Sequence, residues 1–258
     1  MDIASFSMDF FCLKGKNAIV TGGNTGLGQA FSLALAKAGA NVFLPSIMPD
    51  DTEFNGLIEA EGVKTVYMQA DITQESMPKQ IVESCVDTLG SLDILINCAG
   101  ICIIEDVKAF GRAQWDSMIA VNLTAAFEMS HEAALYMIPQ KRGKMINVCS
   151  LFSFLGGQWS PAYAASKHGL AGLTKAYCDE LAQYNIQVNG IAPGYFKTQA
   201  AIASASDPVR EKWITDHTAE GRWGVPLDLM GATVFLASEA SKFVNGHILV
   251  VDGGFLVR

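Results

Sequence analysis

The sequence predicts an α/β domain built on a doubly wound parallel sheet of seven strands with helices on both faces. Apolar, β-rich runs alternate with amphipathic stretches of helical length, which is the rhythm of βαβ units. The runs are apolar almost without interruption, as in strands that crossover helices bury on both faces. No linker, internal repeat or low-complexity tract divides the chain. A single domain over residues 1–258 is therefore favoured over two.

The seven expected strands follow one another along the chain. In order, they lie within NAIVTG, ANVFLP, KTVYMQAD, LDILINCAG, GKMINVCS, IQVNGIAPG and GHILVVDGG. Helical patterns fill the intervals between these runs. Two of the helices, around 112–138 and 161–184, carry more apolar residues than one face of a sheet requires.

Residues 199–225 break this rhythm. They are polar, small and poorly periodic, with a short helix expected around 207–217. In an open α/β sheet, a long insertion after the carboxyl end of a strand lies over the ligand crevice. We therefore expect residues 199–225 to form a substrate lid, with a merely long loop as the alternative.

Composition argues against several classes of protein. A net charge of −8 and a pI near 5.0 disfavour binding along nucleic acid, which needs many cations. No apolar run approaches the roughly 20 residues that span a bilayer, and the first residues lack the basic start of a signal peptide. The six cysteines form no CxxC pair and the four histidines are dispersed. We therefore expect a cytoplasmic protein without a metal site.

A glycine-rich turn joins the first expected strand to the first helix. It reads TGGNTGLG over Thr21–Gly28, directly before the helical stretch QAFSLALAKAG. Glycines in such a turn let backbone approach a pyrophosphate, and the helix that follows offers free N–H groups and partial positive charge. The spacing, Gly22-x3-Gly26-x-Gly28, differs from the commoner GxGxxG, and a glycine turn can also simply connect packed elements. Its position at the start of the sheet favours a dinucleotide site in a Rossmann-type domain.

The stretch PAYAASKHG places Tyr163 and Lys167 four positions apart on an expected helix. Side chains with this spacing share one face, so the phenol and the ammonium meet. A free phenol has a pKa of about 10, and a neighbouring cation lowers that pKa by favouring phenolate. A surface tyrosine beside a solvated lysine would show the same pattern. Ser150 should emerge at the carboxyl edge of the sheet, where its hydroxyl can bond a reacting oxygen or cap a helix.

Taken together, these motifs resemble the short-chain dehydrogenase/reductase superfamily along essentially the whole chain. The glycine turn fits TGxxxGxG, and QADI, NCAG and GIAPGYFKT fit further family motifs, with Cys98 where asparagine is usual. The resemblance implies hydride transfer between a nicotinamide cofactor and an alcohol or ketone, whose hydroxyl proton needs an acceptor. It assigns catalysis to Asn122, Ser150, Tyr163 and Lys167. In that assignment Tyr163 is the acid–base residue, Lys167 also binds the nicotinamide ribose, and Asn122 orders a water.

The same resemblance implies a set of cofactor contacts. Besides Tyr163 and Lys167, these are Thr21, Gly22, Asn24, Thr25, Gly26, Leu27, Gly28, Ser46, Asp71, Ile72, Asn97, Ala99, Gly100, Pro193, Gly194, Phe196 and Thr198. Ser46 should face the adenosine ribose, where NAD-preferring relatives often carry an aspartate. NADP would need a cation near its 2′-phosphate, and no Lys or Arg occurs between Lys37 and Lys64. The sequence therefore favours NAD, with NADP as the alternative.

A narrower resemblance concerns the substrate. NTGLGQA, IAPGYFKTQ, GRWGVPLDLMG and the ending VNGHILVVDGGFLVR resemble the gluconate 5-dehydrogenase and 2-dehydro-3-deoxy-D-gluconate 5-dehydrogenase branch, which acts on sugar acids. Arg222 in GRWG fits either a carboxylate site or a helix-start and packing element. A sugar acid needs donors beside the nicotinamide, and the candidates are Ser150, Gln158, Trp159, Lys197 and His217. Three of these have an equally good alternative interpretation. Trp159 fits interface packing, Lys197 fits a solvated charge, and His217 fits an ordinary surface residue.

Two other function classes stay open at this point. A reductase of another carbonyl substrate, such as a polyol or ketose or a 3-oxoacyl thioester, would use the same tetrad. The acyl-carrier version should show a basic docking patch, which this acidic chain does not clearly show. A non-catalytic dinucleotide-binding sensor has no need for the tetrad. Because family members commonly form tetramers and the two long helices are apolar, we expect a homotetramer, unless those residues serve only the monomer's core.

Overall fold

The computed structural model describes residues 3–198 and 206–258, and their sheet has seven parallel strands. The strands are β1 Asn17–Val20, β2 Asn41–Ser46, β3 Thr65–Gln69, β4 Ile94–Asn97, β5 Gly143–Val148, β6 Ile186–Pro193 and β7 Ile248–Val251. Their order in the sheet is β3-β2-β1-β4-β5-β6-β7. The chain therefore starts in the middle, builds outward to β3, and then builds outward again to β7. This confirms the predicted doubly wound, Rossmann-type fold.

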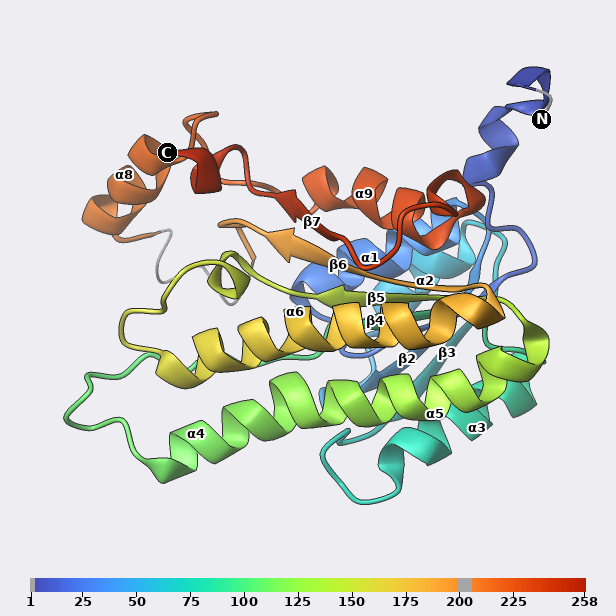
Figure 1. Cartoon of the computed structure of the whole chain (residues 1–258), viewed down its shortest axis with the longest axis horizontal. Coiled ribbons are helices and arrows are strands. Elements are labelled where there is room, and N and C mark those ends of the chain that lie inside the picture. The colour runs from blue at the N-terminus through green and yellow to red at the C-terminus, as the bar shows by residue number, and fades with distance from the viewer. Residues whose placement is uncertain (1–2, 199–205) are drawn as a thin grey trace.

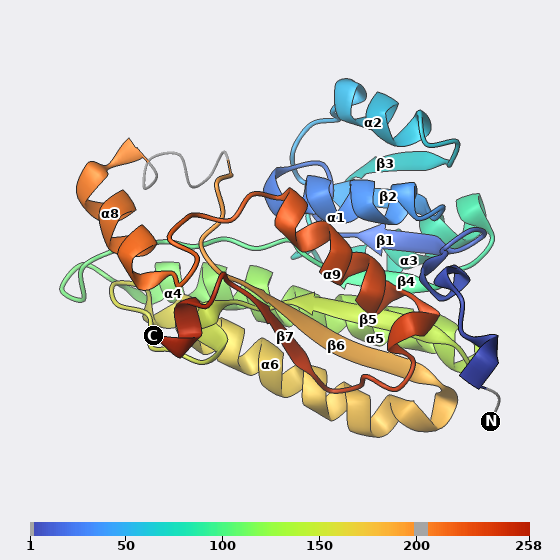
Figure 2. The same ribbon diagram turned by 90° about the horizontal axis from the view of Figure 1, so that it is seen from above.

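Helices cover both faces of the sheet (Figure 1, Figure 2). One side holds α1 Gly26–Lys37, α2 Thr52–Glu59 and α9 Leu227–Ala237, and the other holds α3 Met77–Leu89, α4 Arg112–Ile119, α5 Ala125–Gln140 and α6 Pro161–Leu181. A wide π-helical turn at Ala120–Thr124 joins α4 to α5, so the expected long helix there is one continuous run. A further helix, α8 Pro208–His217, stands beyond the carboxyl ends of β6 and β7 (Figure 1).

The hydrophobic core lies in two layers because successive strand residues point to opposite faces. In β1, Val20 packs in the layer under α1 and α9, whereas Ile19 packs in the layer with α3, α5 and α6. Both residues are fully buried. Burial on two faces explains why the strands are continuous apolar runs rather than alternating ones.

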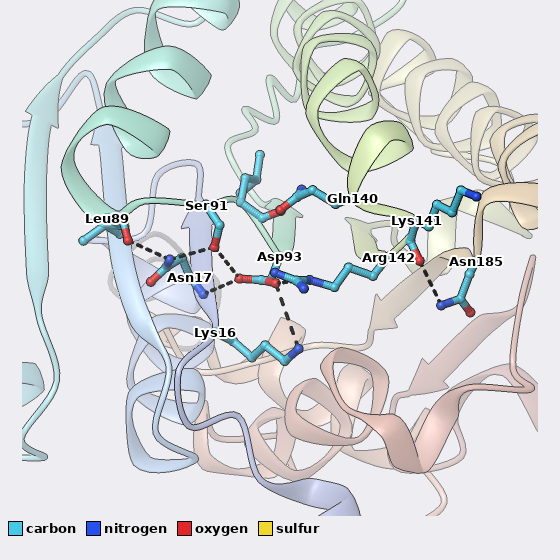
Figure 3. A network of polar contacts seen from close by, with 10 residues as sticks. Lys16, Asn17, Leu89, Ser91, Asp93, Gln140, Lys141, Arg142 and Asn185 are labelled. Carbon is cyan, nitrogen blue, oxygen red and sulfur yellow. Dashed lines mark hydrogen bonds and ion pairs between the residues drawn. The ribbon is translucent and has the colours of Figure 1, made fainter.

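One buried carboxylate ties together the amino ends of the central strands (Figure 3). Asp93 Oδ2 accepts hydrogen bonds from the backbone N–H of Asn17 at 3.1 Å and from the Ser91 hydroxyl at 2.9 Å. Its Oδ1 pairs with the Arg142 guanidinium at 3.0 Å and with the Lys16 ammonium at 4.0 Å. These partners make a buried charge tolerable. The network holds the register of the strands at the edge opposite their carboxyl ends.

Three further features concern the described part of the chain. No helix there is both long and apolar enough to cross a bilayer. No group of three or more His, Cys, Asp or Glu side chains within residues 3–198 and 206–258 could hold a metal ion. All six cysteines are free thiols.

Candidate active site

A cleft of about 470 Å³ opens at the carboxyl edge of the sheet. The glycine turn after β1, the segment after β4, the end of β5, the start of α6 and the turn after β6 form its walls. Ser150, Tyr163 and Lys167 all line it. Both the size and the position of this cleft are typical of ligand sites in open α/β sheets.

The glycine turn has a backbone that other residues could not adopt. Gly22 and Gly26 have φ values of +65° and +52°, in the left-handed region that favours glycine. A Cβ on Gly28 would lie 2.1 Å from the Gly22 carbonyl oxygen. Thr25 precedes α1 without a side-chain hydrogen bond to its first turn, so those N–H groups are available to an anion. The turn is therefore suited to a phosphate.

Thr21 anchors this turn to the neighbouring strand. Its Oγ1 accepts hydrogen bonds from the backbone N–H groups of Cys98 and Ala99, both at 3.0 Å. The segment after β4 is thereby held against the glycine turn, and Cys98, Ala99 and Gly100 line the cleft. Burial raises the pKa of the Cys98 thiol to about 12, so this unusual residue is a neutral part of the wall.

The phenol, ammonium and hydroxyl predicted to carry out catalysis converge in the structure. Lys167 Nζ lies 5.6 Å from the centre of the Tyr163 ring. The same ammonium donates a hydrogen bond to the Val148 carbonyl at 2.7 Å, and the lysine side chain is buried. The Ser150 hydroxyl is close enough to the Tyr163 phenol to act on the pKa of that phenol, which it lowers. The arrangement at the end of β5 thus has an acid–base group, a cation and a second hydroxyl.

Desolvation dominates the electrostatics of this pair. Burial raises the pKa of Tyr163 to about 12, although the hydrogen bond with Ser150 acts in the opposite direction. Burial also lowers the pKa of Lys167. From the sequence we expect the lysine to lower the pKa of the phenol. In the structure that pKa is raised instead, because removing both groups from water disfavours their charged forms. In this environment the phenol is protonated at neutral pH.

Ser150 has the capping role, one of the two that the sequence left open, and its bond to a reacting oxygen stays a prediction. Its Oγ accepts a hydrogen bond from the Phe152 N–H at 3.2 Å and so caps the short helical turn Leu151–Ser153. The same hydroxyl lowers the pKa of the Tyr163 phenol. The Phe152 ring then packs edge-on against the Tyr163 ring, with centroids 5.8 Å apart. Capping therefore fixes the serine and positions the phenol at the same time.

Asn122 lies in the π-helical turn, which directs its amide toward the segment after β4. Its Oδ1 accepts from the Ile101 N–H and its Nδ2 donates to the Ile101 carbonyl, both at 2.8 Å. A Cβ on Gly100 would lie 3.2 Å from Asn122 Oδ1 and 3.8 Å from Lys167 Nζ. Asn122 thus stands close to the Lys167 ammonium without lining the cleft. Its ordering of a water stays a prediction.

Seven predicted cofactor contacts do not line the cleft: Thr21, Asn24, Ser46, Asp71, Ile72, Asn97 and Phe196. Two of them shape the turn after β2, where Asn24 Nδ2 donates to the Pro49 carbonyl at 2.8 Å and Ser46 Oγ accepts from the Met48 N–H at 3.2 Å. Phe196 is buried in the core under α9. Their contact with a cofactor stays a prediction. The other predicted contacts, Gly22, Thr25–Gly28, Ala99, Gly100, Pro193, Gly194 and Thr198, line the cleft together with Tyr163 and Lys167.

Asn97 and Asp71 also bond within the protein. Asn97 Nδ2 donates to the Ser130 hydroxyl at 2.9 Å and to Asn147 Oδ1 at 2.8 Å, on the α5 side of the sheet. The Asp71 carboxylate accepts from the hydroxyl and the backbone N–H of Thr73, and these bonds lower its pKa. Asn97 therefore links β4 to β5 and α5, and Asp71 organises the turn after β3.

The substrate candidates are more scattered than the tetrad. Only Ser150 lines the cleft, while Gln158, Trp159, Lys197 and His217 are exposed. Trp159 has a φ of +63°, a strained value for a bulky residue. His217 stacks on Trp213 at 4.3 Å between ring centroids and hydrogen-bonds its carbonyl through Nδ1. The direct contact of these four residues with a substrate stays a prediction.

The GRWG motif contacts the start of α9, as expected for a helix-start element. Arg222 Nη1 lies 2.7 Å from Asp228 Oδ2 in the first turn of α9, and the same carboxylate accepts from the Val225 N–H at 2.9 Å. Arg222 also pairs with Glu220 at 3.0 Å. Its guanidinium is therefore committed to carboxylates of the protein itself.

Comparison with known proteins agrees with this geometry. The short chain dehydrogenase family model matches residues 16–208. The chain is 64% identical over 254 residues to the uncharacterized oxidoreductase YgcW of Escherichia coli K12, covering 98% of this chain and 97% of that protein. It is 43% identical over 252 residues to a 2-dehydro-3-deoxy-D-gluconate 5-dehydrogenase of Bacillus subtilis, covering 97% and 98%. A crystal structure of a gluconate 5-dehydrogenase from Burkholderia cenocepacia, in complex with NADP and tartrate, matches with a TM-score of 0.91 at 35% identity, covering 97% and 98%.

Proposed function

Since this chain belongs to the short-chain dehydrogenase family, we propose that it transfers a hydride between a nicotinamide dinucleotide and a secondary alcohol or ketone of a sugar acid. It is an oxidoreductase of the short-chain dehydrogenase type. The observation that carries the proposed reaction is the convergence of Ser150, Tyr163 and Lys167 on one cleft beside the glycine turn. The sugar-acid class, such as gluconate or a keto-deoxygluconate, rests on the names of relatives 35% to 43% identical to the chain.

The glycine turn fits a dinucleotide. Its bare backbone and the open amino end of α1 are the features that a pyrophosphate requires. Gly22 and Thr25–Gly28 would hold the phosphates, and Lys167 would bond the nicotinamide ribose. When bound, the dinucleotide supplies or accepts the hydride.

The protein's own contribution is proton transfer at the Tyr163 oxygen. In ketone reduction the phenol gives its proton to the substrate oxygen, and in alcohol oxidation it takes one. Ser150 would donate a hydrogen bond to the reacting oxygen of the substrate and stabilise charge that develops there. A pKa raised to about 12 favours the donor role. Positive charge close to the ring, from Lys167 and from an oxidised nicotinamide, acts against burial and supports the acceptor role.

We propose NAD as the preferred dinucleotide. The turn after β2 carries Asp50 and Asp51, and Asp51 caps α2 through the Phe54 N–H. Neither carboxylate favours the 2′-phosphate of NADP, which needs a cation. The gluconate 5-dehydrogenase relative holds NADP, so kcat/KM measured with both dinucleotides is a direct test. A tenfold preference for NADP would contradict this proposal.

The substrate class is tested by a screen. Hexonates, ketohexonates, hexuronates and uncharged polyols are each offered with NAD and NADP, and the reduced nicotinamide is followed by its absorbance. We expect activity on hexonates or ketohexonates, lost in Tyr163→Phe while the dinucleotide still binds. Activity on uncharged polyols alone would refute the sugar-acid assignment, and an unchanged kcat in Tyr163→Phe would refute the role of the phenol.

Three further proposals concern a substrate lid, the oligomeric state and the cellular location. The segment 199–225 is proposed as a substrate lid, of which residues 199–205 lie outside the described residues and α8 is the expected short helix. A homotetramer is proposed because Trp115, Phe127 and Leu135 are exposed along α4 and α5. Light scattering tests the assembly, and a monomeric mass would refute it. A cytoplasmic location likewise stays a prediction.

A further inference from the structure

The inner face of α8 carries a cation. Ile214 is fully buried, so the face of α8 that carries Ile214 is turned to the body of the protein. Arg210 precedes Ile214 by four residues and shares that face, at the amino end of the helix. Arg210 is partly buried, whereas its neighbour Val209 is 80% exposed. The end of α8 that carries Arg210 stands beyond the carboxyl edge of the sheet (Figure 2).

The Arg210 guanidinium lowers the pKa of two groups near the cleft. Cys102 lines the cleft, and burial raises the pKa of its thiol while Arg210 is among the charges that lower it. Burial raises the pKa of the Tyr195 phenol, and Arg210 lowers it. Tyr195 also interacts electrostatically with Tyr163, the acid–base residue. Ring contacts tie α8 to the same place, because Trp213 of α8 packs against Phe255 with centroids 5.9 Å apart and Phe255 packs against Tyr195 at 5.2 Å. Tyr195 directly follows Pro193 and Gly194, which line the cleft.

Two other cations near this edge already have partners within the protein. The Lys167 ammonium donates to the Val148 carbonyl inside the wall. Lys212, on the outer side of α8, pairs with Asp216 at 2.6 Å. Arg210, in contrast, forms no ion pair with any residue of the described ranges 3–198 and 206–258. A partly desolvated guanidinium without an anionic partner is available to a ligand.

We infer that Arg210 binds the carboxylate of the substrate and so selects sugar acids over uncharged polyols. This inference rests on the proposed function. A planar guanidinium bonds a carboxylate with two parallel hydrogen bonds, which fixes orientation as well as affinity. The partial positive charge at the amino end of α8 acts in the same direction. With the carboxylate at Arg210 and the reacting hydroxyl at Tyr163, the carbon chain is held at both ends, which orients it for transfer.

The inference is tested first by selectivity. KM and kcat are measured for D-gluconate, for the screened sugar acid that reacts best, and for an uncharged hexitol, in wild type, Arg210→Met, Arg210→Lys and Lys212→Met. We expect Arg210→Met to raise KM for the acids roughly 10- to 100-fold and to leave the hexitol and dinucleotide binding unchanged. Arg210→Lys should restore part of the affinity. Lys212→Met, a matched change on the outer face of the same helix, should have no effect.

The placement of Arg210 is tested separately, without any substrate. Cys102 is an exposed thiol in the cleft, and Cys12 is an exposed thiol near the amino terminus that serves as an internal reference. A nearby cation favours the anionic reagent iodoacetate over neutral iodoacetamide. We therefore expect Arg210→Met to lower the iodoacetate preference at Cys102 several-fold and to leave Cys12 unchanged, as read by peptide mass spectrometry. An unchanged preference at Cys102 would overturn the placement and the inference with it.

The outcomes separate the inference from the proposed function. If the wild type converts sugar acids and Arg210→Met keeps its KM for them, the inference is wrong and the proposed function stands. If the wild type with dinucleotide neither converts nor binds any sugar acid in calorimetric titration, the proposed function and the inference are both wrong. A loss of acid selectivity in Arg210→Met alone supports both.

Discussion

Gly28→Ala should weaken dinucleotide binding without unfolding the protein. The added Cβ would lie 2.1 Å from the Gly22 carbonyl oxygen, 2.9 Å from its carbon and 3.0 Å from Gly23 Cα, whereas ordinary contacts begin near 3.4 Å. The turn or the first turn of α1 must therefore move by about 1 Å, and such overpacking costs about 1–3 kcal/mol. Because the displaced atoms are those that face a pyrophosphate, we expect the cost to appear as a roughly 5- to 150-fold higher Kd.

The assay is a fluorescence titration with reduced dinucleotide, run beside urea unfolding of the same variant. Gly56→Ala in α2 and Gly172→Ala in α6 are matched controls, because a Cβ at either position meets open space. Both controls should bind the dinucleotide as the wild type does and gain about 0.5–1 kcal/mol of stability, as alanine does in a helix. A Gly28→Ala variant that binds as tightly as these controls would refute the assignment of the turn.

Three other variants test the buried polar groups. Burial lowers the pKa of Lys144 from 10.5 to about 8. Below pH 8 its charge therefore disfavours the folded state by up to about 3 kcal/mol. The stability of the wild type should rise between pH 8 and 10.5, because only the unfolded state keeps the proton there. Lys144→Met should therefore be the more stable protein at pH 7 and lose that advantage by pH 10.5 in urea unfolding; an advantage that does not shrink would contradict this. Thr21→Val leaves two backbone N–H groups without their acceptor and should cost about 2–3 kcal/mol in the same measurement, while a loss within error would mean that water replaces the hydroxyl. Lys167→Ala should lose turnover and also raise the dinucleotide Kd at least about tenfold, which separates it from Tyr163→Phe; an unchanged Kd would exclude its role at the ribose.

The strands and the tetrad could be predicted because each depends on local pattern. Every expected apolar run contains its strand to within one residue, since strands buried on both faces need no alternation. Tyr163 and Lys167 face each other because helical spacing alone brings them together. Ser150 needs only to follow the end of β5 to reach the same edge.

The side chains that the sequence did not place depend on partners from distant segments. Asn97 ends β4 as expected, but its amide bonds Ser130 and Asn147, whose hydroxyl and carbonyl lie on the α5 side. Arg210 follows an unpatterned stretch, and only the burial of Ile214 one turn later shows which face of α8 it occupies. The four-residue spacing of Arg210 and Ile214 indicates that they share a helix face. Nothing in the neighbouring sequence indicates that this face turns toward the body of the protein.

The two edges of the sheet treat buried charge in opposite ways, and this difference explains where function can lie. At the amino edge, Asp93 is satisfied by protein donors, so its charge is neutralised within the fold and contributes register. At the carboxyl edge, Lys167 has a single carbonyl partner among its hydrogen bonds and Arg210 has no anion within the described residues. These buried and partly buried cations lack anionic partners among the residues that the structure describes. A bound dinucleotide and an acid substrate would supply the missing hydrogen bonds and negative charge. The amino edge, where Asp93 has its partners, therefore holds the strands in place. The carboxyl edge, where these cations lack anions from the described part of the chain, is the edge that can bind ligands.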